Sequence, residues 1–174
     1  MHISIAIKKI CPKNDIYLFS FIDEDKAIDS LKPKRINVLH PDFTREEFSS
    51  VDFKEWVIFD DVDVFPTSIR KKKMSIFNNI LIIGRHENVS ICFTTHSPTA
   101  GAETTLLLIE ATIVVIFPKT TGNRALKYLL DSYLGLDKKQ IERDKKMKSR
   151  AVSIIRGYPQ VIEGEKQAFL AHEF

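Results

Sequence analysis

The sequence predicts an α/β fold built on a three-layer, mostly parallel sheet with a C-terminal antiparallel hairpin. Apolar runs rich in β-branched and aromatic residues alternate with helical patterns over most of the 174 residues, which is typical of a parallel sheet covered by helices. Near the end, the turn residues Gly157-Tyr158-Pro159 and Gly164-Glu165 separate three short apolar runs, as expected of an antiparallel meander. The length and an apolar content of 44% indicate one domain, spanning residues 1–174.

The elements follow from the same patterns, taken in chain order. Strands are expected at 15–21, 35–39, 56–59, 89–95 and 112–117, and the meander strands at 151–156, 160–163 and 166–170. Helices are expected at 2–10, 25–31, 44–48, 68–86, 102–110, 123–134 and 137–148. The 44–48 helix is indicated by the capping-box spacing from Thr44 to Glu47, and the 68–86 helix by one apolar stripe that includes Ile76 and Ile80.

The segment Trp56-Val57-Ile58-Phe59-Asp60-Asp61 is the strongest functional signal. Four apolar residues predict a strand buried on both faces, and two carboxylates follow it directly. Leaving two charges at the end of a buried strand costs several kcal/mol unless a cation or a donor meets them. The arrangement therefore indicates a Mg²⁺-nucleotide site of the Walker B type, with a strand-end turn as the simpler alternative.

The phosphate-binding loop that normally accompanies a Walker B strand does not occur in these 174 residues. Such a loop needs several glycines followed by Lys-Ser or Lys-Thr, so that backbone N–H groups surround the phosphates. None of the six glycines precedes the Asp60-Asp61 strand, and none is followed by such a pair. Any nucleotide-dependent function must account for this.

Further motifs follow the Asp60-Asp61 strand in a definite order. They are a helix ending in Gly84-Arg85-His86, a strand Ile91–His96 leading into Ser97-Pro98-Thr99, the run Thr112–Pro118, and a basic segment leading to Arg150–Ile154 and Tyr158-Pro159. Over residues 15–170 this order resembles the genome-packaging ATPases of large DNA viruses and virophages, a branch of the FtsK/HerA superfamily. The resemblance implies a P-loop NTPase fold of the RecA-like type.

The resemblance also suggests a reason for the missing loop. In this family a helix and the second strand of the sheet follow the P-loop, and residues 2–10 and 15–21 fit that order. The chain is therefore expected to begin directly after the P-loop and to lack the first strand of the sheet. That absence predicts a gap beside the Trp56 strand, with exposed apolar surface that favours instability or association with another chain.

The resemblance assigns roles to several residues at the predicted sheet edge. It implies that Asp60 holds Mg²⁺ and helps bind ATP, that Asp61 is the catalytic base, and that Thr95 contacts the nucleotide. His96 would sense the γ-phosphate or polarise the water, and Arg85 would reach the nucleotide of a neighbouring subunit. The simpler alternatives are a histidine packed in a loop and a cation that stabilises the end of a helix.

Two basic clusters stand out in a chain whose net charge is only +3. The first is Arg70-Lys71-Lys72-Lys73. The second places seven cations within the thirteen residues from Lys138 to Arg150, including Lys145, Lys146 and Lys148. A solvated helix face is the usual meaning, whereas in a DNA translocase such charges would contact duplex phosphates without reading sequence.

Taken with the resemblance, the sequence predicts a viral ATPase that hydrolyses ATP and drives double-stranded DNA into a capsid. The cofactors would be ATP and Mg²⁺, bound weakly or not at all without the P-loop. The partners would be DNA and a homo-oligomeric ring, or another chain that supplies the missing part, in the host cytoplasm or the virion.

The alternative is a non-catalytic ATPase remnant that binds DNA or a partner. A nucleotide kinase is disfavoured because no Arg-rich lid is visible. No apolar run reaches the length of a membrane span.

Overall fold

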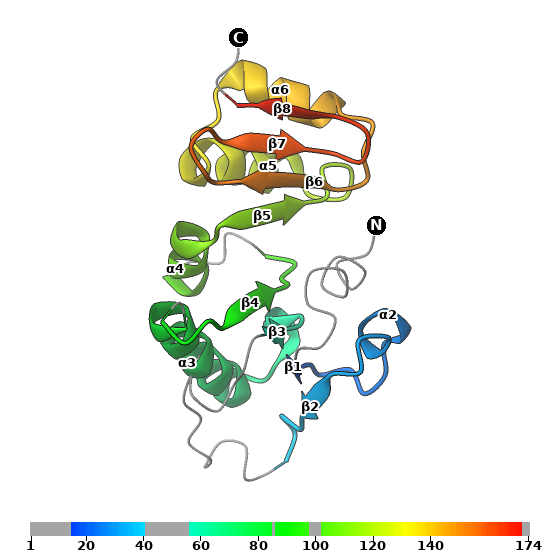
Figure 1. Cartoon of the computed structure of the whole chain (residues 1–174), viewed down its shortest axis with the longest axis vertical. Coiled ribbons are helices and arrows are strands. Elements are labelled where there is room, and N and C mark those ends of the chain that lie inside the picture. Colours follow the sequence, from blue (N-terminus) through cyan, green and yellow to red (C-terminus); the bar gives the residue numbers. More distant parts are fainter. Residues whose placement is uncertain (1–14, 41–55, 85, 98–101, 172–174) are drawn as a thin grey trace. The chain divides into compact units, whose positions relative to one another are not determined.

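The computed structural model describes residues 15–40, 56–84, 86–97 and 102–171 (Figure 1). The chain divides into two compact units, Met1–Ser97 (unit 1) and Pro98–Phe174 (unit 2). Unit 1 carries a parallel sheet and unit 2 an antiparallel sheet. The fold is therefore mixed α/β, and the single domain over 1–174 stays a prediction. The predicted helices at 2–10 and 44–48 lie outside the described residues.

Unit 1 is built on a four-stranded parallel sheet in the order β2-β1-β3-β4. Its strands are β1 (Ile16–Phe19), β2 (Lys34–Ile36), β3 (Trp56–Phe59) and β4 (Ser90–Phe93). Phe59 pairs in register with Phe19 on one side and with Phe93 on the other, so these three strands end together. The predicted parallel pairing of the Trp56 and Ile91 strands is confirmed. The predicted gap beside the Trp56 strand is wrong, because β1 and β4 flank β3.

One face of the parallel sheet is covered by the long helix α3 (Thr67–Ile83). The rings of Phe19 and Phe59 stack at 4.8 Å, and the ring of Phe77 packs edge-on against Phe59 and tilted against Phe93. Because side chains alternate along a strand, the in-register phenylalanines share this face. The apolar stripe of α3 fits this aromatic layer and fixes the helix over the strand ends.

The opposite face of the sheet carries a second apolar cluster. Ile16, Leu18 and Ile58 are buried there, and Ile28 of the short helix α2 (Lys26–Asp29) packs against them. Residues of α3 and α2 therefore contact opposite faces of the parallel sheet, and the three-layer arrangement stays a prediction. β3 is buried along most of its length, as predicted, whereas β4 is only half-buried.

Unit 2 is an antiparallel sheet in the order β5-β6-β7-β8. The strands are β5 (Ile113–Ile116), β6 (Val152–Ile155), β7 (Val161–Glu163) and β8 (Ala168–Leu170). The helical elements are α4 (Ala102–Glu110), α5 (Asn123–Tyr128), the π-helical turn η4 (Leu129–Tyr133) and α6 (Lys138–Lys146). Their apolar residues join one core that includes Leu108, Leu130, Ile141 and Ile154.

β5 corrects part of the predicted sheet. It was expected as a buried strand parallel to the Ile91 strand, but it pairs antiparallel with β6, Ile116 opposite Val152. Ile113 and Val115 are 55% and 37% exposed, while Ile116 is buried. The antiparallel sheet is therefore longer than the predicted terminal hairpin. A short apolar run cannot by itself reveal whether both of its faces are covered. Among the described residues, no helix is long and apolar enough to cross a membrane.

Candidate functional site

The Asp60 carboxylate lies at the carboxyl edge of the parallel sheet, directly after β3, and is 9% exposed. Ser20, which follows β1, donates a hydrogen bond of 2.9 Å from its hydroxyl to Asp60 Oδ2. Thr94, which follows β4, has its hydroxyl 3.0 Å from Asp60 Oδ1. Each oxygen of Asp60 therefore meets a hydroxyl from a neighbouring strand. The in-register ends of the three strands bring these side chains together.

Asp61 turns the chain sharply away from β3. Its φ of +41° is left-handed, a conformation that non-glycine residues adopt at some cost and that Asp tolerates better than most. Its backbone N–H donates to Thr94 Oγ1 at 2.8 Å, and its Oδ1 lies 3.3 Å from the same hydroxyl. Because Thr94 has one hydroxyl proton, it donates to Asp60 or to Asp61 at any moment. Thr94 thus joins both carboxylates.

His96 lies at the same edge, beside Asp61. Its Nε2 is 3.4 Å from Asp61 Oδ1, and its side chain is 76% exposed. The pair is ionic only when the imidazole is protonated. The prediction that Asp60 and His96 share one edge of the sheet is confirmed, because parallel strands end on the same side. The position next to Asp61 would let His96 orient a water molecule held by that carboxylate.

Asp63 organises the loop that follows β4. Its Oδ2 accepts hydrogen bonds from Thr95 Oγ1 at 2.5 Å, His96 N at 2.8 Å and Ser97 N at 3.1 Å. Asp63 lies in the short 3₁₀ turn η3 (Val62–Val64), so it ties the segment after β3 to the segment after β4. The Thr95 hydroxyl, predicted to contact nucleotide, donates to Asp63 instead. Its role at the nucleotide stays a prediction.

Lys73 fits neither meaning considered for the basic cluster at residues 70–73, a solvated helix face or a set of phosphate contacts. Its side chain is fully buried in the middle of α3. Its Nζ donates to the carbonyl oxygen of Phe19 at 3.1 Å and lies 3.4 Å from that of Asp60. Burial lowers the pKa of Lys73 to about 7, against the opposing effect of the Asp60 and Asp61 charges. The charge pattern of the run could not reveal which of its members turns inward.

The donor set at this edge suits Mg²⁺. Carboxylate and hydroxyl oxygens are hard ligands, and Mg²⁺ is usually held by one or two carboxylates, with waters and substrate phosphates completing the octahedron. Asp60 and Asp61 supply two such carboxylates. The described residues bring no three His, Cys, Asp or Glu side chains together as an all-protein metal cage. Asp60 and Asp61 are therefore the two side chains at this edge that could hold a divalent cation.

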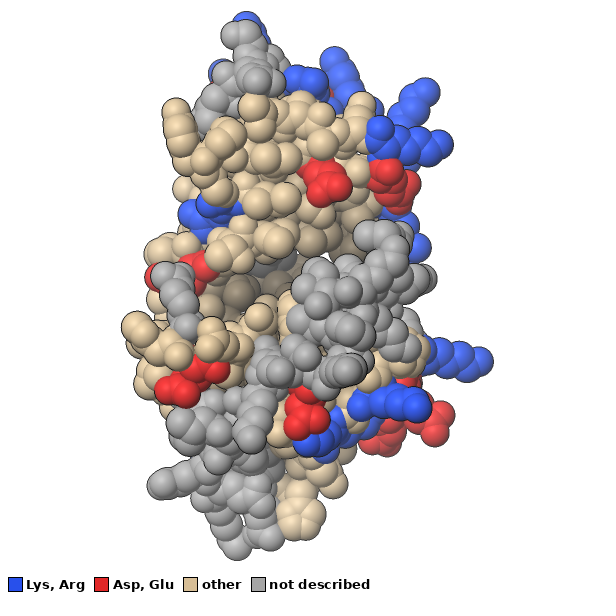
Figure 2. All heavy atoms as spheres, in the orientation of Figure 1, with Lys and Arg blue, Asp and Glu red and all other residues tan. Residues whose placement is uncertain are grey.

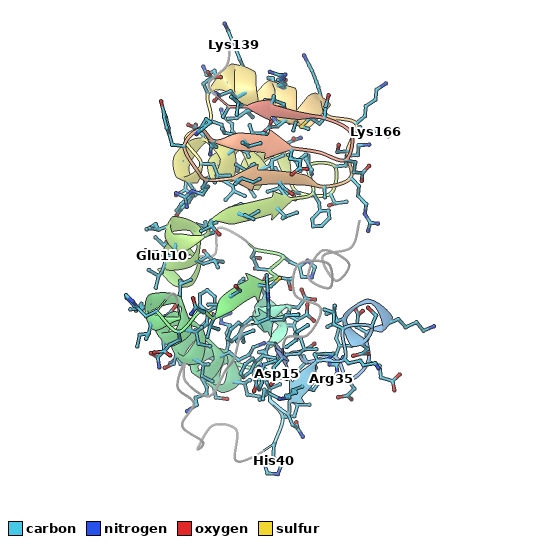
Figure 3. The ribbon with its side chains drawn as sticks, in the orientation of Figure 1. Asp15, Arg35, His40, Glu110, Lys139 and Lys166 are labelled. Atoms are coloured by element: carbon cyan, nitrogen blue, oxygen red, sulfur yellow. The ribbon has the colours of Figure 1, made fainter. Side chains whose placement is uncertain are left out.

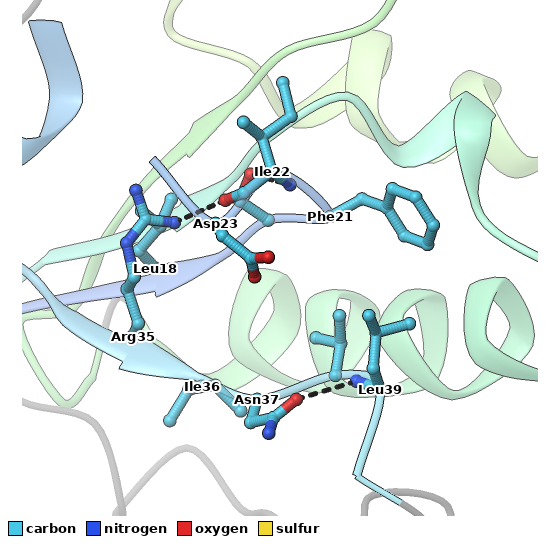
Figure 4. A pocket seen from close by; sticks show the side chains of 10 residues that line it. Leu18, Phe21, Ile22, Asp23, Arg35, Ile36, Asn37 and Leu39 are labelled. Carbon is cyan, nitrogen blue, oxygen red and sulfur yellow. Dashed lines mark hydrogen bonds between the residues drawn. The ribbon is translucent and has the colours of Figure 1, made fainter. Parts of the chain in front are cut away.

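A small cavity of about 230 Å³ adjoins this site on the β2 side (Figure 4). Ser20 and Leu18 line it, and Arg35 borders it while donating to the carbonyl oxygen of Ile22 at 2.7 Å. Arg35 also forms an ion pair of 2.5 Å with Asp29. Because both contacts hold the guanidinium in place, Arg35 serves here as structural support for the loop after β1.

Sequence reasoning missed three residues at this edge. Ser20 and Thr94 each follow a strand that neighbours β3. A hydroxyl residue directly after such a strand is the signal that could have revealed them. Lys73 had no such signal. Arg85, predicted as a catalytic arginine, lies outside the described residues.

The second predicted site, the basic segment, lies in unit 2. Helix α6 begins at a capping box between Asp137 and Gln140, and the cations follow along it. Lys146, Lys148 and Arg150 are exposed, whereas Lys145 is half-exposed and lies 3.8 Å from Glu142. Figure 2 shows Lys and Arg side chains gathered on this part of unit 2, and Figure 3 shows Lys139 on α6 and Lys166 on the β7–β8 turn.

The sheet register extends this basic region beyond the predicted residues. Because Ile116 pairs with Val152 and Ser153 with Glu163, the segments after β5, before β6 and between β7 and β8 lie at one end of the sheet. These segments carry Lys119, Lys148 with Arg150, and Lys166. All four side chains are exposed. We call Lys119, Lys145, Lys146, Lys148, Arg150 and Lys166 the basic end of unit 2.

Asp144 contrasts with the basic end. It is fully buried in α6, and neither of its carboxylate oxygens has a hydrogen-bond partner among the described residues. Burial raises the pKa of Asp144 to about 7, against the opposing effect of Arg143. Arg143 itself lies over the ring of Phe169 at 3.7 Å. Asp144 thus faces the interior of unit 2, whereas Arg143 stays exposed while its guanidinium covers that ring.

Comparison with known proteins links the chain to a virophage. It is 34% identical over 166 residues to "Uncharacterized protein V3" of Sputnik virophage. The match covers 92% of this chain and 66% of that relative, so the chain spans a little less than two thirds of the relative's length. No family model matches the chain. No solved structure matches it either.

Proposed function

We propose that the carboxyl edge of the parallel sheet is the Mg²⁺-nucleotide site of a viral ATPase that drives double-stranded DNA into a capsid. The observation that supports this best is the Asp60 carboxylate, which meets the hydroxyls of Ser20 and Thr94 from the two flanking parallel strands. A strand-end turn needs no such convergence. A carboxylate held this way is ready to accept a hard cation.

The proposed roles follow from the position of each group. Asp60 would hold Mg²⁺, with the Ser20 and Thr94 hydroxyls orienting its two oxygens. Asp61 would accept a proton from the attacking water, and His96, 3.4 Å away, would orient that water. Mg²⁺, when bound with ATP, would neutralise charge that develops on the phosphates.

The phosphate cradle would come from outside these 174 residues, because none of the six glycines is followed by Lys-Ser or Lys-Thr. We therefore propose that this chain alone binds nucleotide weakly and turns over no significant ATP. The competing function is a non-catalytic remnant that binds DNA or a partner. The exposed cations of unit 2 favour DNA binding by the ATPase and by the remnant alike, so they do not distinguish the two functions.

The basic end of unit 2 is the proposed DNA contact. Lys119, Lys148, Arg150 and Lys166 are exposed and come from three segments at one end of the sheet, and the exposed Lys146 ends helix α6 just before one of them. Phosphate contacts of this kind fix a protein on a duplex but carry no sequence information. The similarity to a virophage protein supports a viral origin and adds nothing about DNA or the reaction.

The test is metal-dependent ATP binding, measured with Mn²⁺ in place of Mg²⁺ by electron paramagnetic resonance. We expect weak binding in the wild type that Asp60→Asn abolishes. The matched control is Glu87→Gln, which removes one carboxylate charge from an exposed residue after α3 and should change nothing. ATP hydrolysis by the wild type should stay at background.

Three outcomes separate the possibilities. Equal Mn²⁺·ATP binding by the wild type and Asp60→Asn would rule out Asp60 as the metal ligand. Duplex DNA binding without any metal-dependent nucleotide binding would favour the remnant. ATP turnover that disappears in Asp60→Ala would show that this chain holds a complete site, contrary to the proposed dependence on an external phosphate cradle.

A further inference from the structure

Lys73 is a buried cation placed directly behind the candidate site. It has no exposed surface, although a buried ammonium costs several kcal/mol unless other groups compensate it. Its ammonium lies 3.5 Å from the centre of the Phe65 ring, a cation–π contact. Its polar contacts are the carbonyl oxygens of Phe19 and Asp60, at 3.1 and 3.4 Å. A less costly residue would fill this space equally well if packing were the only requirement.

The two carbonyl groups lie where β1 and β3 end. The Phe19 carbonyl also accepts from the Asp60 N–H at 2.9 Å, so it receives one bond from the neighbouring strand and one from Lys73. The next side chains along each strand are Ser20 and Asp60, which are hydrogen-bonded to each other. Lys73 thus holds the two strand ends together just before the carboxylate site begins.

The peptide group between Asp60 and Asp61 is held from both sides. Its carbonyl oxygen is the one that faces Lys73 Nζ, and its N–H donates to Thr94 Oγ1 at 2.8 Å. The residue that follows this peptide group has the left-handed φ of +41°. A sparsely populated backbone conformation persists only when surrounding contacts enforce it. Here the two contacts fix the peptide plane, and the peptide plane sets the directions of both carboxylates.

We propose that Lys73 is a positioning residue that, together with Thr94, holds the Asp60–Asp61 peptide group in the orientation that presents both carboxylates to a divalent cation. It acts through the backbone and does not touch the ligand. This inference rests on the proposed function for the identity of the ligand. The effect of Lys73 on the backbone does not depend on it.

The test replaces Lys73 with Met, which keeps most of the length of the side chain and removes the ammonium group. Nuclear magnetic resonance of the free protein gives the first readout, because the HN–Hα coupling of Asp61 reports φ and its amide exchange reports the bond to Thr94. We expect both to change in Lys73→Met. The control is Lys71→Met, which makes the same change at an exposed position of the same helix and should alter neither.

The second readout is the affinity for Mn²⁺·ATP. Loss of a residue that supports a metal ligand typically lowers metal affinity by 10- to 100-fold, and we expect a fall of about tenfold in Lys73→Met. If Asp60→Asn has no effect on binding, the proposed function fails, while the Asp61 coupling still decides the role of Lys73.

Unchanged coupling and exchange at Asp61 in Lys73→Met would overturn the proposal, even if stability falls. If that variant does not fold, the wild type itself decides. Well below pH 7, where the amino group is protonated, a Lys73 ammonium signal that persists in water, with contacts to the Phe65 ring, is the expected result. Rapid exchange of that ammonium with solvent would overturn the proposed contact.

Discussion

The Ser20 hydroxyl donates a hydrogen bond of 2.9 Å to Asp60, joining the ends of two parallel strands across 40 positions of sequence. Thr94 makes the matching contact from the other flanking strand. The carboxylate is therefore oriented by the register of the sheet rather than by its own loop.

Thr94→Val should destabilise unit 1 and weaken metal binding together. The change keeps the shape of the side chain but removes the oxygen that accepts from the Asp61 N–H, and an unsatisfied N–H costs about 1–3 kcal/mol. The free energy of unfolding, from denaturant titration, and the Mn²⁺·ATP affinity should both fall. Ser90→Ala, at an exposed position of β4, is the control. A stability equal to that of the wild type would mean that the contact with Asp61 does not form in solution.

Asp63→Asn should loosen the loop after β4. The carboxylate accepts three hydrogen bonds from residues 95–97, and the amide that replaces it offers one oxygen instead of two and no charge. We expect faster amide exchange at His96 and Ser97 and a loss of roughly 1–3 kcal/mol in the free energy of unfolding. Asp23→Asn should change neither. Unaltered exchange at both amides would contradict the assigned role of Asp63.

Asp144 should make unit 2 less stable as the pH rises. Its pKa is about 7 in the folded state against 3.8 for the ordinary carboxyl, so the folded state binds more protons between these values. Stability contributed by the protonated form is therefore present near pH 4 and is lost as the pH rises through about 7.

Asp144→Asn removes this titration. Above pH 7 the variant should exceed the wild type in free energy of unfolding by at most about 4 kcal/mol, since one pKa unit corresponds to about 1.4 kcal/mol. The difference should shrink towards pH 4. Asp131→Asn, an exposed residue of the same unit, should leave the pH profile unchanged. A difference that does not vary with pH would show that Asp144 is not the titrating group.

The basic end of unit 2 should bind duplex DNA without sequence preference. Replacing Lys145, Lys146 and Lys148 with Ala should weaken binding at low salt and flatten the plot of log K against log salt, by about 0.9 for each lost phosphate contact. Lys145 should contribute least because it is half-exposed and lies near Glu142. The measurement is a salt titration on two unrelated duplexes.

Two further variants test the shape of this surface. Lys119→Ala with Lys166→Ala should lower the slope further, because the sheet register places both at the same end as Arg150. Arg124→Ala with Lys127→Ala, which removes two exposed cations from α5, is the control of equal charge. Equal slopes for the wild type and all variants would show that the basic end does not contact DNA. Its cations would then form only a solvated helix face.

The elements of the fold were largely predictable from local pattern. The helix at 68–86 is found as α3, and the helix at 102–110 as α4, because apolar spacing and turn residues act within a few positions. The helix expected at 123–134 is divided into α5 and the π-helical turn η4, a change in hydrogen bonding that spacing does not reveal. The pairing of β5 was not predictable, because strands four residues long carry little information about their neighbours.

Sequence by itself determined that an apolar strand ends at Asp60 and Asp61, that neighbouring strands alternate with helices, and that cations cluster from Lys138 to Arg150. Only the tertiary structure decided which groups meet those carboxylates. Ser20 and Thr94 reach Asp60 because three parallel strands end in register, and Lys73 turns inward because α3 lies over those same ends. Local pattern records the type and period of an element, whereas the partner of a polar group depends on residues distant in sequence that packing alone brings within hydrogen-bond distance.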